Sequence, residues 1–382
     1  MEKIVILRQP QKLVFGNGCS EQIIRDIPRL GISRVLIVTS KPIMPFVQPL
    51  SDQLKNEGIA VTVWDTSDCE PTIEMLEAGL ETFRRIRADG VIGFGGGSVL
   101  DLAKLIAALC DGEQMVTDVF GIDKLNGRNP YLACLPTTAG TGSEVSPNAI
   151  LFDPLDQLKK GVVSPYLVPD ATYVDPLFTR TVPPSVTAAT GMDALVHCIE
   201  AYANRFAHTI TDNYAMEGIR LISANLKKAY ENSLDMEARA NLALGSMYGG
   251  FCLGPVNTGA VHALAYPLGG NYHIPHGVSN AVLLRYVMEF NMQADLQRYA
   301  AIAKALGAEI GCNDRKTAQQ GVDIISMLAD QCGIPSKISE LGIPYEDLEE
   351  MAESAITVTR LLKNNLREVT YRDALAIYRN AW

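Results

Sequence analysis

An aspartate and a histidine one helical turn apart, Asp193 and His197, are the residues of this sequence best suited to chemistry. They lie in a run, residues 186–202, whose composition and spacing predict a helix. Residues four apart on a helix project from the same face, so these two side chains could hold one cation. Two further histidines, His262 and His276, follow in a chain that contains five in all. A carboxylate with imidazoles favours a divalent first-row metal such as Fe2+ or Zn2+ over Mg2+ or Ca2+. A surface ion pair or a helix-stabilising contact is the alternative interpretation of the Asp-x3-His pair on its own.

The composition is that of an ordinary soluble globular protein. The chain has 382 residues, 47% of them hydrophobic and 20% charged, which predicts two domains rather than one. A net charge of -10 argues against nucleic acid as a partner. No apolar run is long enough to span a bilayer, and the first residues do not resemble a signal peptide. The eight cysteines include no C-x-x-C pair, so we expect reduced thiols and a cytoplasmic protein.

The order of the predicted elements divides the chain into two parts. Short β-rich runs alternate with amphipathic helical runs in the first half, which predicts a mostly parallel sheet covered by helices on both faces. The predicted strands are residues 12–15, 34–38, 60–64, 90–94 and 131–135. From Pro183 onward the apolar spacing is mainly helical. We therefore expect an α/β nucleotide-binding domain at residues 1–181 and an all-helical domain at residues 182–382.

A glycine-rich turn follows the fourth predicted strand. Gly96 and Gly97 lack a Cβ, which lets a backbone approach a phosphate, and the helix that follows presents free N–H groups at its start. Ser98 is expected to cap this helix, residues 99–110, with Asp101 as its reciprocal partner. The spacing is not the dinucleotide-binding G-x-G-x-x-G pattern. A pyrophosphate site and a tight turn without a ligand are both compatible with it.

Small hydroxyl residues and glycines crowd a second loop, residues 136–144, after the fifth predicted strand. Thr137 and Thr138 could donate hydrogen bonds to a nucleotide. They could equally form a cluster of side-chain turns without a ligand. The loop alone does not decide between these interpretations.

Taken together, these segments resemble the iron-containing alcohol dehydrogenases, which share a fold with glycerol dehydrogenase and dehydroquinate synthase. The resemblance covers nearly the whole chain. It includes Gly95-Gly96-Gly97-Ser98, the loop from Thr137 to Glu144, Gly191-Met192-Asp193-Ala194 with His197 and Glu200, His262-Ala263-Leu264-Ala265, and Pro275-His276-Gly277 with Asn280. It implies an α/β nucleotide-binding domain followed by an all-helical metal-binding domain.

The resemblance also implies particular site residues. The metal ligands are expected at Asp193, His197, His262 and His276. The cofactor contacts are expected at Ser40, Gly96, Gly97, Ser98, Thr137, Thr138, Asn148 and Lys159. The metal would be Fe2+, with Zn2+ as the alternative because Zn2+ stands higher in the affinity series. The cofactor would be NAD or NADP, and a homodimer is expected because relatives usually form dimers.

Two positions depart from the family pattern. Ser40 stands where members that prefer NAD often carry an aspartate, which would bind the ribose hydroxyls and repel a 2′-phosphate. NADP is therefore still a possible cofactor, and the adjacent Lys41 could attract its 2′-phosphate. Tyr266 stands where many members carry a histidine credited with proton transfer. His273 could replace that histidine in a relay, or it could be a solvent-facing loop residue.

The implied activity is reversible hydride transfer between a small alcohol or aldehyde and NAD(P). A bound dication can lower the pKa of its water from about 15.7 to about 7. Such a shift corresponds to roughly 12 kcal/mol, more than one hydrogen bond from Thr or Tyr could supply. The alternatives are a dehydroquinate synthase-like lyase, a glycerol dehydrogenase-like enzyme, or a binding protein without turnover. The apolar residues beside the expected ligands, such as Ala194 and Leu264, favour a small, weakly charged substrate.

Overall fold

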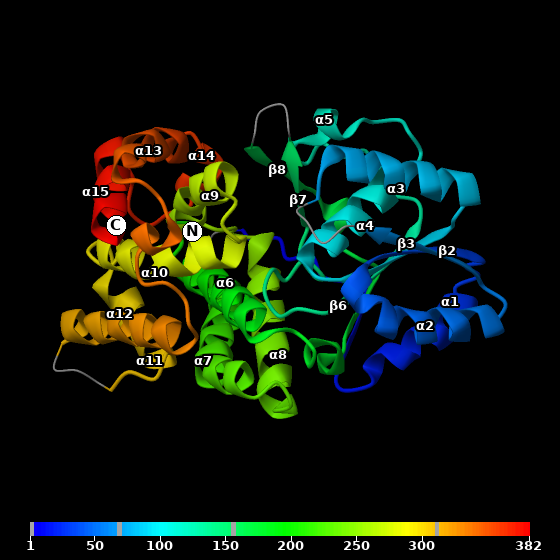
Figure 1. Cartoon of the computed structure of the whole chain (residues 1–382), viewed down its shortest axis with the longest axis horizontal. Helices are drawn as coiled ribbons and strands as arrows, with labels where there is room; N and C mark the ends of the chain where they lie inside the picture. The colour runs from blue at the N-terminus through cyan, green and yellow to red at the C-terminus, as the bar shows by residue number, and fades with distance from the viewer. Residues whose placement is uncertain (1–3, 67–70, 154–157, 310–312) are drawn as a thin grey trace. The chain divides into compact units, whose positions relative to one another are not determined.

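The computed structural model describes residues 4–66, 71–153, 158–309 and 313–382. They form two compact units, shown in Figure 1. The α/β unit contains Arg8–Thr138 and Ser143–Thr181. The helical unit contains Val182–Trp382, the short stretch Ala139–Gly142 and the N-terminal segment up to Leu7. Unlike the expected domains, the two units are therefore discontinuous in sequence, because part of the threonine loop packs with the helices.

A six-stranded parallel sheet forms the centre of the α/β unit. Its strand order is β1 (Lys12–Phe15), β9 (Ala171–Val174), β6 (Tyr131–Pro136), β4 (Gly90–Gly95), β2 (Arg34–Ser40) and β3 (Ala60–Thr66). A smaller sheet contains β5 (Gly121–Ile122), β8 (Leu158–Val163) and β7 (Asn148–Asp153). The five predicted strands are confirmed. The sequence analysis missed β5, β7, β8 and β9, because these strands are short or contain lysine, glycine and asparagine, which are uncommon in strands.

Helices cover both faces of the large sheet, as Figure 1 shows. Alternate residues of a strand point to opposite faces. Val35 and Ile37 of β2 accordingly pack with α1 (Gln22–Arg29) and α2 (Met44–Asn56). Leu36 and Val38 pack instead with α3 (Ile73–Ile86) and α4 (Gly97–Leu109). A one-turn helix, α5 (Val116–Val119), and the 3-10 helices η1 (Cys19–Glu21), η2 (Lys41–Ile43), η3 (Pro165–Leu167) and η4 (Pro176–Thr179) complete the unit.

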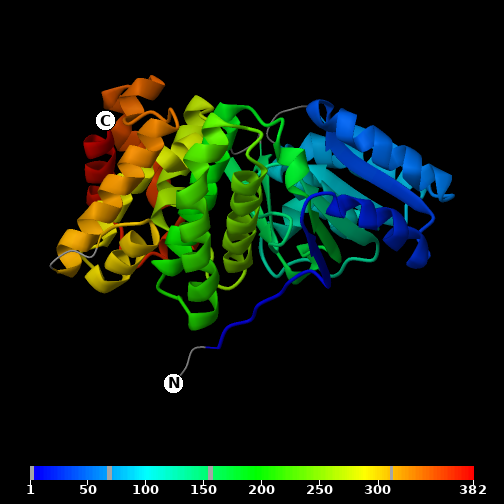
Figure 2. The same ribbon diagram turned by 90° about the horizontal axis from the view of Figure 1, so that it is seen from below.

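The helical unit is built around α6, which is buried over most of its length. Figure 2 shows its long helices side by side. Its elements are α6 (Pro184–Tyr202), α7 (Thr209–Glu231), α8 (Met236–Leu253), α9 (Ala260–Tyr272), α10 (His276–Asn291), α11 (Leu296–Ala305), α12 (Asp314–Gln331), η5 (Ile338–Leu341), η6 (Tyr345–Asp347), α13 (Leu348–Ile356), α14 (Thr359–Leu362) and α15 (Tyr371–Ala381). Close packing depends on small residues: a Cβ added to Gly191 of α6 would lie 2.3 Å from the Leu226 side chain of α7.

The predicted start of the helix after the glycine turn is wrong. The helix begins at Gly97, with Gly96 as the N-cap residue and no side-chain cap hydrogen bond. Ser98 therefore lies in the first turn, where its side chain is exposed. Asp101 accepts hydrogen bonds from Ser143 Oγ at 2.5 Å and from the Ile150 amide at 2.9 Å. The carboxylate thus fixes a neighbouring loop instead of closing a capping box.

Candidate metal centre and nucleotide site

Three elements of the helical unit bring the four expected metal ligands together. Asp193 and His197 lie one turn apart on α6, His262 lies near the start of α9, and His276 is the first residue of α10. Ligand atoms of Asp193, His262 and His276 all lie within 4.8 Å of one another. Asp193, His197 and His262 are buried, whereas the His276 side chain is 33% exposed.

The distances between these side chains test whether a cation would fit. Nε2 of His262 lies 3.1 Å from Nε2 of His197. Oδ1 of Asp193 lies 3.7 Å from Nε2 of both His262 and His276. Two facing Nε2 atoms can share only one hydrogen, so at least one unshared pair points inward. A buried cluster of a carboxylate and imidazole nitrogens with this geometry fits a divalent cation.

Glu200, one further turn along α6, fixes the orientation of His262. Its Oε2 lies 2.6 Å from Nδ1 of His262, and its Oε1 accepts the Val261 amide at 2.6 Å. A carboxylate at Nδ1 holds the proton on that nitrogen, which leaves Nε2 free to act as a ligand. The sequence analysis quoted Glu200 only as part of the resemblance. Its role could have been predicted from spacing, because positions 193, 197 and 200 share one face of a helix.

Asn280 fixes the orientation of the Asp193 carboxylate. It lies one turn after His276 on α10, and its Nδ2 donates to Oδ1 of Asp193 at 2.7 Å. The same Nδ2 lies 3.2 Å from Nε2 of His276. Asn280 was also quoted without a role, although the spacing of four residues places it on the same helix face as His276.

The ionisation of the cluster favours a bound cation. Burial would raise the pKa of Asp193, but the three nearby imidazoles and the Asn280 amide outweigh it and lower the pKa to about 2. Burial lowers the pKa of His197, and the nearby Asp193 carboxylate only partly opposes this effect. At neutral pH the cluster therefore presents a negative carboxylate and neutral imidazole at these two positions, the forms that bind metal.

The expected pyrophosphate contacts lie at the carboxyl end of the large sheet. Gly95 of β4 pairs with Pro136 of β6, so the turns that follow these two strands are adjacent. The Thr137 amide donates to the Gly95 carbonyl at 3.0 Å, and a Cβ added to Gly96 would lie 3.5 Å from the Thr138 side chain. The sheet therefore brings Gly96, Thr137 and Thr138 together at the uncapped start of α4. Free N–H groups at such a helix start suit a phosphate.

Ser40 ends β2, the strand next to β4, and its side chain is buried. Lys41 follows at the start of η2 and is exposed. Ser40 thus lies on the same edge of the sheet as the glycine turn, with a hydroxyl in place of a carboxylate.

Asn148 and Lys159, the two remaining expected contacts, occupy opposite ends of one ladder. Asn148 opens β7 and pairs with Val163, whereas Lys159 of β8 pairs with Phe152. Four ladder steps separate the pairs, or about 13 Å along the strands. Oδ1 of Asn148 is buried without a hydrogen-bond partner among the described residues, which leaves it available to a ligand.

Lys104 is a buried residue whose role the sequence analysis missed. Its Nζ donates to the carbonyls of Ser143 and Ser146 at 2.9 Å each, and also to that of Asn148. Burial lowers the pKa of Lys104, while the Asp101 carboxylate opposes the shift. Lys104 and Asp101 therefore hold the loop that leads into β7. A lysine inside an apolar helical run was the sequence signal for such a role.

Tyr266 and His273, the two candidates for proton transfer, occupy different environments on α9. Tyr266 lies one turn after His262, is half-buried, and its hydroxyl accepts a hydrogen bond from Arg360 at 3.4 Å. Burial raises the pKa of Tyr266, so the phenol stays protonated at neutral pH. His273 ends the helix in the left-handed region, with φ of 54°, and its side chain is exposed. The exposure of His273 favours the interpretation as a solvent-facing residue.

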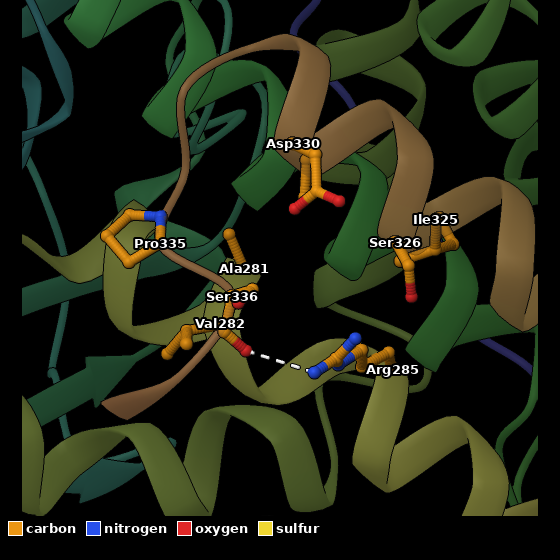
Figure 3. Close-up of a pocket in the computed structure, with 9 residues that line it drawn as sticks. Ala281, Val282, Arg285, Ile325, Ser326, Asp330, Pro335 and Ser336 are labelled. Atoms are coloured by element: carbon orange, nitrogen blue, oxygen red, sulfur yellow. Dashed lines mark hydrogen bonds between the residues drawn. The ribbon is translucent and has the colours of Figure 1, made fainter. Parts of the chain in front are cut away.

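A hollow elsewhere in the helical unit does not involve the candidate ligands. Figure 3 shows it between α10 and α12, with Arg285 donating to the Ser336 carbonyl at 3.2 Å. It is lined by Ala281, Val282, Arg285, Ile325, Ser326, Ala329, Asp330, Pro335 and Ser336.

Two family models match the chain, one for each part. Residues 10–176 match the iron-containing alcohol dehydrogenase model, and residues 187–382 match the C-terminal model of the same family. The chain belongs to the iron-containing alcohol dehydrogenase family. The expected fold class, metal-dependent alcohol dehydrogenase or aldehyde reductase activity, iron and nicotinamide cofactor are thereby confirmed.

Individual relatives are similar to this chain over nearly the full length of both proteins. The chain is 38% identical to long-chain-alcohol dehydrogenase 1 of Geobacillus thermodenitrificans, covering 96% of this chain and 94% of the relative. It is 30% identical to the NAD-dependent methanol dehydrogenase of Bacillus methanolicus, covering 97% and 98%. The structure of a 1,3-propanediol oxidoreductase has a TM-score of 0.96 at 33% identity and covers all of both chains. Among the described helices, none is both long enough and apolar enough to cross a membrane.

Proposed function

We propose that this enzyme transfers a hydride between a short alcohol or aldehyde and NAD(P), at a divalent metal held by Asp193, His197, His262 and His276. The observation that supports the proposal most strongly is the buried convergence of imidazole Nε2 atoms, 3.1 Å apart between His197 and His262, beside the ionised Asp193.

The surrounding residues prepare the ligands for that role. Glu200 keeps the proton of His262 on Nδ1, and Asn280 donates to Asp193 Oδ1. A metal held by these residues would supply Lewis acidity, which would favour ionisation of an alcohol and polarisation of an aldehyde. We infer that the hydroxyl of Tyr266, which is half-buried and lies one helical turn after His262, donates a proton to the reduced oxygen.

Family membership determines neither the substrate nor whether the enzyme uses NAD or NADP. The relatives named above are described as acting on methanol, on 1,3-propanediol and on long-chain alcohols, so chain length varies within the family. Ser40 at the end of β2 lacks the charge that would repel a 2′-phosphate, and we infer that NADP is accepted beside NAD. A homodimer and a cytoplasmic location remain predictions from the sequence.

An anaerobic assay of the Fe2+-loaded enzyme tests this proposal. A panel of short aldehydes is offered with NADH and, separately, with NADPH, and nicotinamide absorbance is followed together with product. We expect oxidation of the cofactor in equal amount to the alcohol formed. A lyase of the dehydroquinate synthase type would form product without net change in absorbance, and a binding protein would form none. Full activity after complete removal of transition metal would refute the metal assignment.

A further inference from the structure

The segment that leads into α9 is held by buried asparagine side chains. Nδ2 of Asn204 donates to the carbonyls of Val256 and Asn257, at 3.0 and 3.2 Å. Nδ2 of Asn364 donates to the next carbonyl, that of Thr258, at 2.8 Å. Both asparagines are buried, so these hydrogen bonds form away from solvent. Three successive carbonyls fixed in this way determine where α9 begins, and therefore where its metal ligand lies.

Gly259, the next residue of this segment, lies between a further asparagine and a carboxylate of the metal centre. A Cβ added to Gly259 would lie 3.3 Å from Oε1 of Glu200 and 3.3 Å from Oδ1 of Asn365. Oε1 of Glu200 also accepts the Val261 amide in the first turn of α9, and Oε2 lies 2.6 Å from Nδ1 of His262. Asn365 and the carboxylate that orients a metal ligand therefore flank the same glycine.

Asn365 forms a reciprocal amide pair with Asn291, the last residue of α10. Nδ2 of Asn291 donates to Oδ1 of Asn365 at 2.8 Å, and Nδ2 of Asn365 donates to Oδ1 of Asn291 at 2.7 Å. Both side chains are buried. Hydrogen bonds fix direction as well as distance, whereas apolar contacts are non-directional. The pair therefore holds the end of α10 in one position relative to the segment that contains Asn365.

The segment around Asn365 joins all three helices that carry the expected metal ligands. Its backbone forms a bridge with Asn204, two residues after the end of α6, and the Arg205 amide donates to the Asn364 carbonyl at 2.8 Å. The side chain of Asn365 binds the end of α10 and flanks the residue that precedes α9. A buried polar contact of this kind can select one arrangement of packed helices among others of similar stability.

We propose that the amide pair of Asn291 and Asn365 is a positioning device for the metal centre: through Gly259 it keeps the Glu200 carboxylate on His262, and it fixes α6, α9 and α10 relative to one another. Neither asparagine is an expected ligand, so both act through other residues. The inference rests on the proposed function, because it requires a cation at the four expected ligands. Loss of the amide pair should therefore weaken metal binding by more than the accompanying loss of stability explains.

The first test replaces both amides at once, in the double variant Asn291→Leu/Asn365→Leu. Leucine has the branching of asparagine, and with both amides removed neither one faces an apolar partner. Competition with a chromophoric chelator measures the Zn2+ affinity, and the visible absorption of the Co2+-loaded protein reports the arrangement of the ligands. We expect Zn2+ to bind about 10-fold more weakly than in the wild type, with a changed Co2+ spectrum.

Asn225→Leu is the matched control for this double variant. Asn225 is a buried asparagine of the same unit, and its hydrogen bonds to the Leu221 carbonyl and with Asn241 involve only α7 and α8. Urea unfolding of the metal-free proteins gives the stability that each variant loses. We expect the control to keep the wild-type Zn2+ affinity and Co2+ spectrum. An equal loss of affinity in Asn225→Leu would reduce the effect to general destabilisation and overturn the inference.

A second variant, Gly259→Ala, leaves both amides in place and tests the contact through the glycine. The added methyl group would lie 3.3 Å from Oε1 of Glu200 and from Oδ1 of Asn365, closer than ordinary van der Waals contact, so one of them must move. We expect Zn2+ to bind about 10-fold more weakly. Gly127→Ala, where the added Cβ meets open space, is the control. Wild-type affinity in either folded variant would overturn the inference.

Activity separates this inference from the proposed function. Absence of hydride transfer by the metal-loaded wild type would refute the proposed function, while the Zn2+ affinities would still decide whether the amide pair positions the ligands. A wild type that binds no Zn2+ would overturn both.

Discussion

Replacing Glu200 with glutamine should weaken metal binding although Glu200 itself is not an expected ligand. The carboxylate accepts from two donors, His262 Nδ1 and the Val261 amide, each at 2.6 Å. Glutamine offers one oxygen and one NH2 group, so one of these donors must face another donor. If His262 instead moves its proton to Nε2, the unshared pair needed by the metal is lost.

The size of this effect follows from the buried contacts. An unsatisfied buried donor costs about 1–3 kcal/mol. At about 1.4 kcal/mol per factor of ten, the metal should bind roughly 10- to 100-fold more weakly in Glu200→Gln. The shape of the side chain is unchanged, so the fold should be retained.

Competition with a chromophoric chelator measures this affinity directly, with Zn2+ as the titrant so that oxidation does not interfere. Glu217→Gln is the control, because Glu217 forms an exposed pair with Arg220 on α7 and contacts none of the candidate ligands. We expect wild-type affinity in that control. Wild-type affinity in Glu200→Gln would refute the argument that the carboxylate selects the ligand form of His262.

Three further predictions address other parts of the molecule. Asp193→Asn should abolish turnover while nucleotide binding, followed by NADH fluorescence, survives; undiminished turnover would exclude Asp193 as a ligand. Ser40→Asp should lower kcat/KM for NADPH about 10-fold or more relative to NADH, because a carboxylate there would repel a 2′-phosphate; wild-type activity confined to NADH would contradict the inference on Ser40. Burial raises the pKa of Glu144 to about 7 from 4.5, with a backbone hydrogen bond and Lys104 only partly opposing it. The folded state therefore binds this proton more tightly than the unfolded state, and the stability it contributes below pH 4.5 should be lost as the pH rises to about 7. At about 1.36 kcal/mol per pKa unit the loss is ~3 kcal/mol. Urea unfolding at several pH values should show this loss in the wild type but not in Glu144→Gln.

The sequence by itself predicted most of the helices and strands and, with the family resemblance, the four expected metal ligands. The β2 and β4 segments could be predicted because alternation of strands and helices depends on local composition and period. Asp193 and His197 could be paired because the geometry of one helix fixes their relation. The family resemblance added His262 and His276, which no local rule joins to α6.

Only the tertiary structure decided which residues act on these ligands. The contact between Glu200 and His262 spans 62 residues, and that between Arg360 and Tyr266 spans 94. Local propensities cannot determine such contacts, because they arise from the packing of α6, α9 and α14. The start of α4 also depends on tertiary contacts. Asp101 accepts hydrogen bonds from Ser143 and Ile150, so the capping box predicted between Ser98 and Asp101 does not form.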